Sequence, residues 1–273
     1  MRIIVRNAKH HSILRTACAF PNRWPLSRAM HPTMWPGTSI ILAKWLLAGL
    51  LAGLLAGCSQ ASATNGPQLL PTPSVDVAPG KAGETQTATF AGGCFWGIQA
   101  VFQHVKGVQS AISGYAGGSS QDAHYDIVSS GTTRHAESVK VTFDPTKVTY
   151  GQLLRLFFSI AHDPTQLNAQ GPDSGTQYRS QLFTANAEQQ RVANAYIAQL
   201  TAAKLFNAPI VTKVSGPAAF YRAEAYHQDY ATIHPDNLYI VINDAPKVEH
   251  LKQLFAPLYQ DKPTLANTGL SSR

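Results

Sequence analysis

Apolar and polar positions follow regular periods only in the last two thirds of the chain. The stretch TQTATFA at 85–91 is rich in β-prone residues, and the pair Gly92 and Gly93 ends it. Apolar residues then recur at helical spacing through 98–105. The pattern therefore predicts a strand at 85–91 and a helix directly after it, with Cys94 at the junction.

The same periods predict further elements along the chain. Strands are expected at 108–113, 135–143, 177–184 and 210–214, with a loop at 114–118, and helices at 150–161, 186–204, 221–230 and 247–259. This alternation favours an α/β (α+β) fold, in which one helical layer covers a mixed sheet in a two-layer sandwich. The pattern leaves the order of the strands open.

The N-terminal part of the chain has a different character. The run LLAGLLAGLLAG at 46–57 follows Lys44, has the length of a signal-peptide core, and is short for a membrane span. Its end, LAGCS, resembles the lipobox of bacterial lipoproteins, which are cut before the cysteine and acylated there. We therefore expect an N-terminal extension and lipoprotein signal peptide at 1–57 and lipidation of Cys58. The alternative is an ordinary secretory signal that contains a cysteine.

Composition divides the rest of the chain into three parts. Residues 59–84 are rich in Ser, Ala, Pro and Gly, so we expect an acylated cysteine and flexible tether at 58–84. Residues 85–260 are long enough for one domain with its own core, and 261–273 are expected to form a frayed tail. Ser59 resembles the second residue of lipoproteins sent to the outer membrane. The expected location is therefore the periplasmic side of the envelope, lipid-anchored to the outer membrane.

Charge argues against a nucleic-acid partner. The chain has 22 Lys+Arg and 15 Asp+Glu, but seven of the basic residues and none of the acidic ones precede Cys58. Residues 58–273 are therefore neutral overall, and a basic surface for nucleic acid is not expected.

Cys94 is the first candidate for chemistry. It is the only cysteine of the predicted domain and lies in the motif GCFWG at 93–97. A helix N-terminus stabilises a thiolate, which is the nucleophilic form of cysteine, and neighbouring glycines let another molecule approach the backbone. The alternative is a buried cysteine that acts as a small apolar residue. The flanking glycines and aromatic residues favour the nucleophile.

Glu137 is the second candidate. In the predicted strand 135–143 it has the same parity as Val139, Val141 and Phe143, which share one face. A carboxyl group that points toward an apolar face has a raised pKa and can hold a proton near neutral pH. The alternative is a solvated glutamate at a fraying strand end.

The histidines do not indicate a metal site. Seven follow Cys58, and none has a spacing typical of metal ligands, so no metal is expected. His135 and His162 are expected to bond backbone groups. His227 could act as a base toward Cys94, which leaves a cysteine hydrolase open as an alternative.

Five motifs occur in the order and spacing of one family. They are GCFWG at 93–97, GYAGG at 114–118, HAE at 135–137, HDPT at 162–165 and GTQYRS at 175–180. The chain from about 87 to 235 thereby resembles the A-type peptide methionine sulfoxide reductases. The resemblance implies a ferredoxin-like two-layer sandwich and reduction of methionine S-sulfoxide in proteins and as the free amino acid. We expect a monomer without a cofactor.

The resemblance also implies catalytic roles. Cys94 corresponds to the nucleophile, Glu137 to the acid, and Tyr125 and Tyr178 to the phenols that hydrogen-bond the sulfoxide oxygen. These residue types suit the reaction, because a sulfoxide sulfur becomes electrophilic when its oxygen is protonated or hydrogen-bonded. Attack by Cys94 would release methionine and leave a sulfenic acid. In the same way, Phe95 and Trp96 correspond to the wall that binds the substrate methyl group, and Asp173 to an aspartate of the same pocket.

Two features depart from the family's usual pattern. No cysteine follows Cys94, whereas many members have resolving cysteines near the C-terminus. Regeneration is therefore expected from an external thiol, either a thioredoxin-like domain or a small molecule. Arg134 stands where the family often has glycine, and a pair with Glu137 would weaken the acid unless Arg134 points to the other face.

Overall fold

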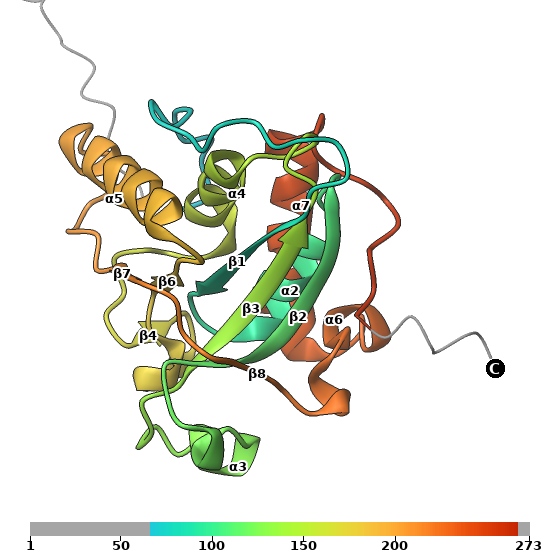
Figure 1. Ribbon diagram of the computed structural model, residues 1–273. Coiled ribbons are helices and arrows are strands. Elements are labelled where there is room, and N and C mark those ends of the chain that lie inside the picture. The colour runs from blue at the N-terminus through green and yellow to red at the C-terminus, as the bar shows by residue number, and fades with distance from the viewer. Residues whose placement is uncertain (1–65, 267–273) are drawn as a thin grey trace, which may run out of the picture. The chain divides into compact units, whose positions relative to one another are not determined.

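The computed structural model describes residues 66–266, and a six-stranded sheet lies at its centre (Figure 1). The strand order is β7-β6-β1-β3-β2-β8. The strands are β1 (Gln86–Ala91), β2 (Val108–Ala116), β3 (Ala136–Phe143), β6 (Gln181–Phe183), β7 (Lys213–Ser215) and β8 (Phe220–Arg222). The inner order β6-β1-β3-β2 is antiparallel and ferredoxin-like, while β7 runs parallel to β6 and makes the sheet mixed. The predicted fold class is confirmed.

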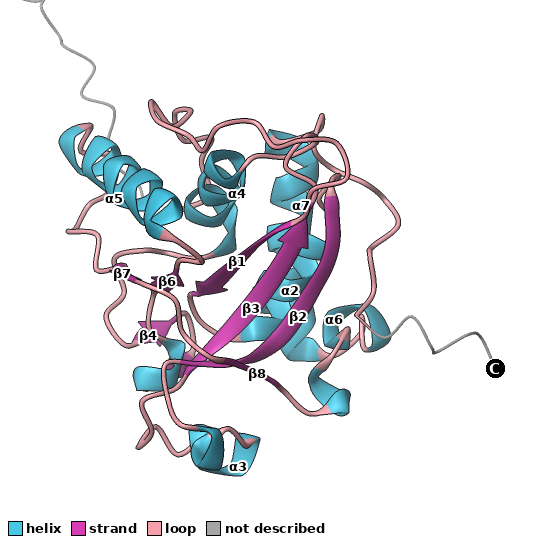
Figure 2. Ribbon diagram, viewed as in Figure 1, coloured by secondary structure: helices cyan, strands magenta, loops and turns pink. Residues whose placement is uncertain are grey.

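Helices cover one side of this sheet (Figure 2). The longer ones are α2 (Phe95–Gln103), α4 (Tyr150–Leu156), α5 (Ala187–Ala202) and α7 (Ala245–Leu254). Two π-helical segments adjoin them, η2 (Phe157–Ala161) after α4 and η5 (Ile240–Asp244) before α7. Short elements fill the connections: η1 (Ser120–Asp122), α3 (Tyr125–Val128), β4 (Ala169–Gln170), β5 (Asp173–Ser174), η3 (Thr176–Tyr178), η4 (Ala225–His227) and α6 (Tyr230–Ile233). Within 66–266, no helix has the length and apolar character needed to cross a bilayer.

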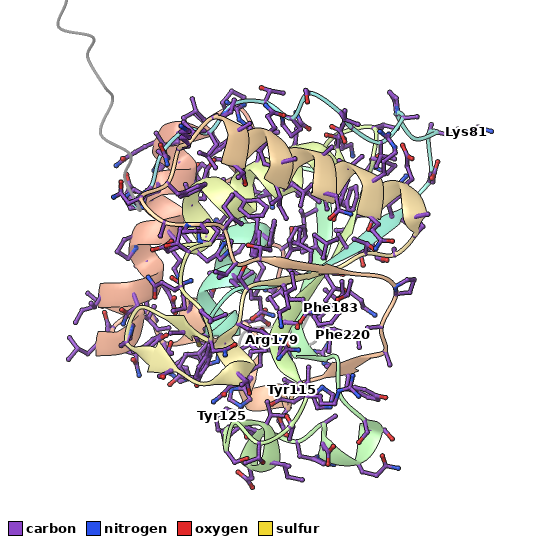
Figure 3. All side chains as sticks on the ribbon, turned by 90° about the vertical axis from the view of Figure 1, so that its left-hand side faces the viewer. Lys81, Tyr115, Tyr125, Arg179, Phe183 and Phe220 are labelled. Carbon is purple, nitrogen blue, oxygen red and sulfur yellow. The ribbon has the colours of Figure 1, made fainter. Side chains whose placement is uncertain are left out.

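The core lies between the sheet and the helical layer. Val139 and Val141 of β3 face it together with Phe90 of β1, whose ring lies 4.6 Å from that of Phe102 in α2. Alternate strand positions point to the other side, where a small cluster is covered by Phe220 of β8 (Figure 3). That cluster consists of Ala91, Ala116, Ala136 and Phe183. The alternation read from the sequence therefore assigns the faces of β3 correctly.

The turn from β1 into α2 depends on two glycines. Gly93 has φ +105°, a conformation that side chains disfavour. A Cβ atom on Gly92 would lie 2.9 Å from the His162 ring, and one on Gly93 would lie 2.5 Å from Gln170. Only glycine fits this backbone without displacing a neighbour, and the turn sets Cys94 at the N-cap of α2.

Residues 68–77, which we call the strap, lie against the helical layer. The backbone N–H groups of Gln68 and Leu70 donate to the carbonyl and hydroxyl oxygens of Ser159, at 3.2 and 3.3 Å. The Leu70 side chain is 1% exposed and belongs to the core. The Leu70 carbonyl accepts a hydrogen bond of 2.6 Å from Arg155 of α4.

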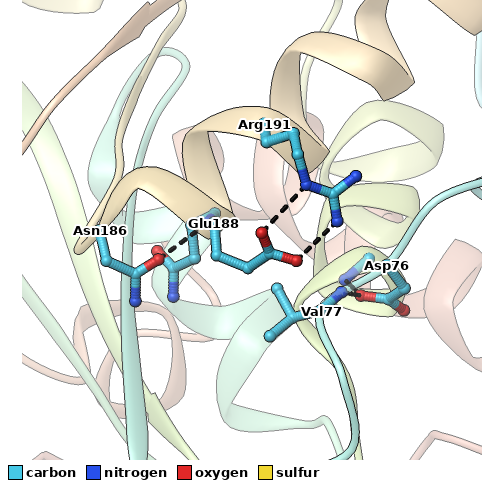
Figure 4. A network of polar contacts seen from close by, with 7 residues as sticks. Asp76, Val77, Asn186, Glu188 and Arg191 are labelled. Carbon is cyan, nitrogen blue, oxygen red and sulfur yellow. Dashed lines mark hydrogen bonds and ion pairs between the residues drawn. The ribbon is translucent and has the colours of Figure 1, made fainter.

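The far end of the strap caps α4. The Asp76 carboxylate accepts hydrogen bonds from the Thr149 hydroxyl at 2.5 Å and from the Gly151 N–H at 2.8 Å. Figure 4 shows Asp76 with Val77, and also the start of α5, where Asn186 caps the helix and Glu188 pairs with Arg191. The predicted flexible tether at 58–84 is therefore wrong for residues 68–77, because their apolar and capping side chains are used in packing.

Two more predictions differ from the structure. The helix expected at 221–230 is instead β8, the turn η4 and the short α6, because Tyr221 pairs with Tyr115 across the sheet edge. The frayed tail expected from 261 onward is wrong for its first part, since Thr264 N–H donates to the Gln103 carbonyl and Ala266 N–H to Asp229. The predicted leader at 1–57, Cys58 and residues 267–273 lie outside the described residues.

Candidate active site

Cys94 lies at the N-cap of α2 and is 9% exposed. Burial raises the pKa of the thiol well above its usual value, and the Trp96 backbone N–H opposes this shift only in part. Glu137 and Asp244, when ionised, raise the pKa of the thiol further. The helix terminus alone therefore does not hold Cys94 as a thiolate before substrate binds. Desolvation exceeds the effect of the helix terminus, and the resting group is a thiol.

Glu137 of β3 is 2% exposed and lies beside the start of α2. Its Oε2 accepts a hydrogen bond of 3.1 Å from the Phe95 N–H. Burial raises the Glu137 pKa to about 8, although this hydrogen bond opposes the shift. Arg134 is exposed and lies outside β3, and none of the ion pairs within 66–266 joins it to Glu137. Glu137 is consequently a neutral acid at neutral pH.

Two phenols face these groups with free hydroxyls. Burial raises the pKa values of Tyr125 and Tyr178, and the charges of Glu137, Cys94 and Asp173 raise them further. In the described part of the chain, neither hydroxyl is hydrogen-bonded to a protein group. Both therefore stay protonated and can donate to an oxygen atom that enters the site.

Polar contacts fix the backbone segments that carry the two phenols. Glu224 accepts from the Tyr115 hydroxyl at 2.8 Å and from the Tyr125 backbone N–H at 2.9 Å, which fixes the start of α3 to β2. Arg179 follows Tyr178 and donates to the carbonyl oxygens of His135 and Arg134, at 2.9 and 2.8 Å. Figure 3 shows Tyr125 and Arg179 near the end of the sheet from which α3 projects.

Trp96 lies in an aromatic cluster. Its ring stacks on Tyr230 with centroids 3.8 Å apart, and the ring of Tyr239 meets it edge-on at 5.8 Å. The indole N–H donates to Nδ1 of His227 at 3.2 Å. Phe95 is 1% exposed, so it forms part of the core behind the site.

Sequence reasoning does not identify Tyr230 or Tyr239. Both follow the last family motif, and no local pattern marks them. Asp173 of β5 accepts a hydrogen bond from the Tyr239 hydroxyl. This bond joins the β4–β5 hairpin to the C-terminal helical segment and gives Asp173 an orienting contact in the pocket.

The position of His227 argues against a hydrolase. Its Nδ1 accepts from the Trp96 indole, so its ring proton lies on Nε2 and no lone pair is left for a thiol proton. Burial also lowers the His227 pKa, and among residues 66–266 no hydrogen bond joins it to Cys94. The ring instead packs on Phe95 and Tyr125, with centroids 5.1 and 4.4 Å away.

The other two candidate histidines contact backbone groups, as expected. Nε2 of His135 bonds the Ser119 carbonyl at 2.8 Å, and Nδ1 of His162 bonds the Phe157 carbonyl at 3.1 Å. No cluster of three or more potential metal ligands occurs in the described region.

Comparison with known proteins places the chain in a family. The family model described as peptide methionine sulfoxide reductase matches residues 86–258. The peptide methionine sulfoxide reductase MsrA 2 of Mesorhizobium japonicum is 61% identical over 181 residues, which cover 66% of this chain and 93% of the relative. MsrA 2 of Synechocystis is 46% identical over 191 residues, which cover 69% and 89%.

A solved structure agrees with these matches. The reduced form of Mxr1 from Saccharomyces cerevisiae is 32% identical, with a TM-score of 0.50 over 57% of this chain and 90% of that one. Fold and sequence together define an oxidoreductase that acts on sulfur. The chain belongs to the A-type peptide methionine sulfoxide reductase family.

Proposed function

We propose that this chain reduces methionine S-sulfoxide, in proteins and as the free amino acid, through a sulfenic acid on Cys94. Family membership establishes the class of reaction, the reduction of peptide methionine sulfoxide. One observation carries the mechanism: the Cys94 thiol and the neutral Glu137 carboxyl group both lie at the N-terminus of α2. Cys94 caps α2, and the next N–H group, that of Phe95, binds Glu137.

In the proposed step, Cys94 attacks the sulfoxide sulfur while Glu137 donates a proton to the sulfoxide oxygen. Tyr125 and Tyr178 hydrogen-bond that oxygen, and Trp96 contacts the methyl group. The attack joins the Cys94 sulfur to the substrate sulfur. That bond and the sulfur–oxygen bond of the substrate then break as the oxygen bonds to the Cys94 sulfur, so methionine leaves as a thioether and the enzyme holds Cys94–SOH. The proton that Cys94 loses replaces the one that Glu137 donates, so the step consumes no net proton. The substrate sulfur gains two electrons and Cys94 loses two.

Regeneration would then use an external thiol. No cysteine follows Cys94 in the sequence, and an acylated Cys58 would be blocked. A thiol of a thioredoxin-like protein or a small molecule would attack the sulfenic acid, release water and form a mixed disulfide with Cys94. A second thiol would resolve it. No metal or prosthetic group enters this scheme.

We also propose that the enzyme repairs envelope proteins while anchored through an acylated Cys58. The lipobox-like LAGCS and the apolar run before it support this location. The strap shortens the available tether, because only residues 59–67 separate Cys58 from the first strap contact at Gln68. Fully extended, these residues span at most about 30 Å.

A stoichiometry experiment tests the proposed function. Purified enzyme is mixed with excess methionine S-sulfoxide without any thiol, and the methionine released is counted. We expect about one methionine per chain, continuous turnover once dithiothreitol is added, and none from Cys94→Ser, because a hydroxyl is a far poorer nucleophile than a thiolate. Two or more methionines per chain without added thiol would contradict the scheme.

A further inference from the structure

A groove lies on the side of the sheet that the helical layer does not cover. It is a cavity of about 700 Å³, lined by β6 and β7 and by neighbouring loops. Arg179 and Phe183 line it, and Phe183 belongs to the small cluster on that side of the sheet (Figure 3). No residue proposed to react or to bind the sulfoxide lines this cavity, so it is separate from the candidate active site.

The groove carries positive charge and no carboxylate. Its three cations are Arg134, Arg179 and Lys213, so we call it the basic groove. Residues 58–273 have equal numbers of basic and acidic side chains, so the groove concentrates a charge that the domain as a whole does not have. None of the ion pairs within 66–266 involves any of the three cations.

The two arginines lie close together although their charges repel. Arg179 donates from Nη2 to the Arg134 carbonyl at 2.8 Å, and burial and the charge of Arg134 lower the pKa of Arg179. The other partners of the Arg179 guanidinium are backbone carbonyls and the Gln181 side chain. These neutral acceptors satisfy its N–H groups but leave its charge uncompensated, so an anion in the groove would relieve the repulsion.

The groove also offers free hydrogen-bond donors. The side chains of Arg134 and Lys213 are exposed and make no hydrogen bond within the described region. The hydroxyl oxygens of Thr133 and Ser215 each accept a hydrogen bond, at 3.2 and 2.7 Å, and keep their own protons for another acceptor. The ligand that fits is therefore negatively charged and rich in acceptor oxygens.

We propose that the basic groove binds a ligand that carries a phosphate group. A phosphate group has about two negative charges and three free oxygens, whereas a carboxylate has one charge and two oxygens, so phosphate matches three cations and two hydroxyls better. A phospholipid headgroup and a soluble phosphate compound present this same chemistry. They differ in whether binding takes place at a membrane.

Titration with pyrophosphate tests the proposal. All proteins carry Cys58→Ala, so that no acyl chain contributes to binding. We expect this parent protein to bind pyrophosphate with Kd below about 1 mM, more weakly as salt is added. The double variant Arg134→Gln, Lys213→Gln should bind at least about tenfold more weakly, because two charged donors are lost.

A matched control removes the same charge elsewhere. Lys81→Gln, Lys252→Gln takes away two exposed cations that do not line the groove, and Figure 3 shows Lys81 well apart from Arg179. This control should bind pyrophosphate within about twofold of the parent. The groove variant should keep its melting temperature and its activity toward free methionine sulfoxide. If it does not fold, Lys213→Gln alone, on the edge strand β7, should still weaken binding by about threefold.

Vesicles distinguish the two sources of phosphate. Binding to phosphatidylcholine is compared with binding to equal parts of phosphatidylcholine and phosphatidylglycerol. A gain with the anionic lipid that the groove variant loses assigns the groove to a lipid headgroup. Pyrophosphate binding without such a gain assigns it to a soluble ligand.

Three results would overturn the proposal. The first is a parent protein that binds neither pyrophosphate nor anionic vesicles, and the second is binding that the groove variant retains in full. The third is stronger binding of polyglutamate than of pyrophosphate, which would indicate an acidic peptide as the partner.

Discussion

The side chains of Glu137 and Cys94 lie together at the start of α2, and each carries a proton there. Burial raises the pKa values of both groups, that of Glu137 to about 8. Near neutral pH the thiol and the acid are therefore both protonated before substrate binds. The arrangement suits a reaction in which the nucleophile ionises only as the substrate oxygen takes up a proton.

Replacement of Glu137 by Gln keeps the shape of the side chain and the acceptor for the Phe95 N–H, but removes the acidic proton. We expect the rate of sulfenic acid formation to fall by roughly 10² to 10⁴, with substrate affinity little changed. The wild-type rate should decline as pH rises through about 8, since Glu137 ionises there, and the variant should lack this decline. Single-turnover kinetics measures the step directly. An unchanged rate in Glu137→Gln would assign the acid role to the tyrosines.

The same substitution has a consequence for stability. The folded chain holds the Glu137 proton up to a pKa of about 8, whereas an unfolded glutamic acid loses it near 4.5. Between these values the folded state binds more protons than the unfolded one, so this group's contribution to stability is lost as pH rises. Urea unfolding should therefore shift in favour of Glu137→Gln between about pH 5 and about pH 9. Glu188→Gln, at an exposed position of α5, should show no such trend.

For single residues, the sequence predicts which face a side chain points to better than it predicts what surrounds that side chain. Strand parity places Glu137 on the buried face because alternation is a local property. The high pKa of Cys94 depends on burial under segments far along the chain, which local pattern does not report. Tyr230 and Tyr239 reach Trp96 from more than 130 residues away, so only the folded arrangement brings them into the site.

At the scale of elements, the amino-acid composition of the strap does not indicate that it packs on the domain. The strap lies within 59–84, a stretch whose abundance of Ser, Ala, Pro and Gly resembles a linker, yet Leu70 and Asp76 fix it to the helical layer. The predicted helix at 221–230 fails for a related reason. Edge pairing with β2 draws Phe220–Arg222 into the sheet, and that pairing is a tertiary contact. Elements whose own side chains decide the structure, such as α2 and β3, are predicted close to their observed bounds.

Two neighbouring leucines test whether the strap stabilises the domain. Leu70→Ala leaves a cavity in the core and should lower the free energy of unfolding by about 2 to 4 kcal/mol. Leu69→Ala, at a side chain that is 53% exposed, should change it by less than about 0.5 kcal/mol. Urea denaturation of both variants measures the difference. Equal effects would show that residues 68–77 behave as a linker in solution.

At the scale of the whole molecule, the proposed anchor and the catalytic domain are close in the chain but separable in function. Cys58→Ala removes the acylated residue, so we expect the protein to leave the membrane fraction while its kcat/KM toward methionine sulfoxide stays within twofold. Fractionation of cells followed by immunoblotting measures the first, and assays of the purified variant measure the second. A variant that stays in the membrane fraction would indicate an uncleaved apolar leader.

The central claim is that Cys94 takes the sulfoxide oxygen, and a measurement of whether Cys94 gains one oxygen atom tests it most directly. Enzyme is incubated with methionine S-sulfoxide and no thiol, and its mass is measured intact and after digestion. The mechanism predicts a gain of one oxygen, located on the peptide that contains Cys94, absent in Cys94→Ser and reversed by dithiothreitol. Release of methionine without any oxygen on Cys94, or the same gain in Cys94→Ser, would contradict it.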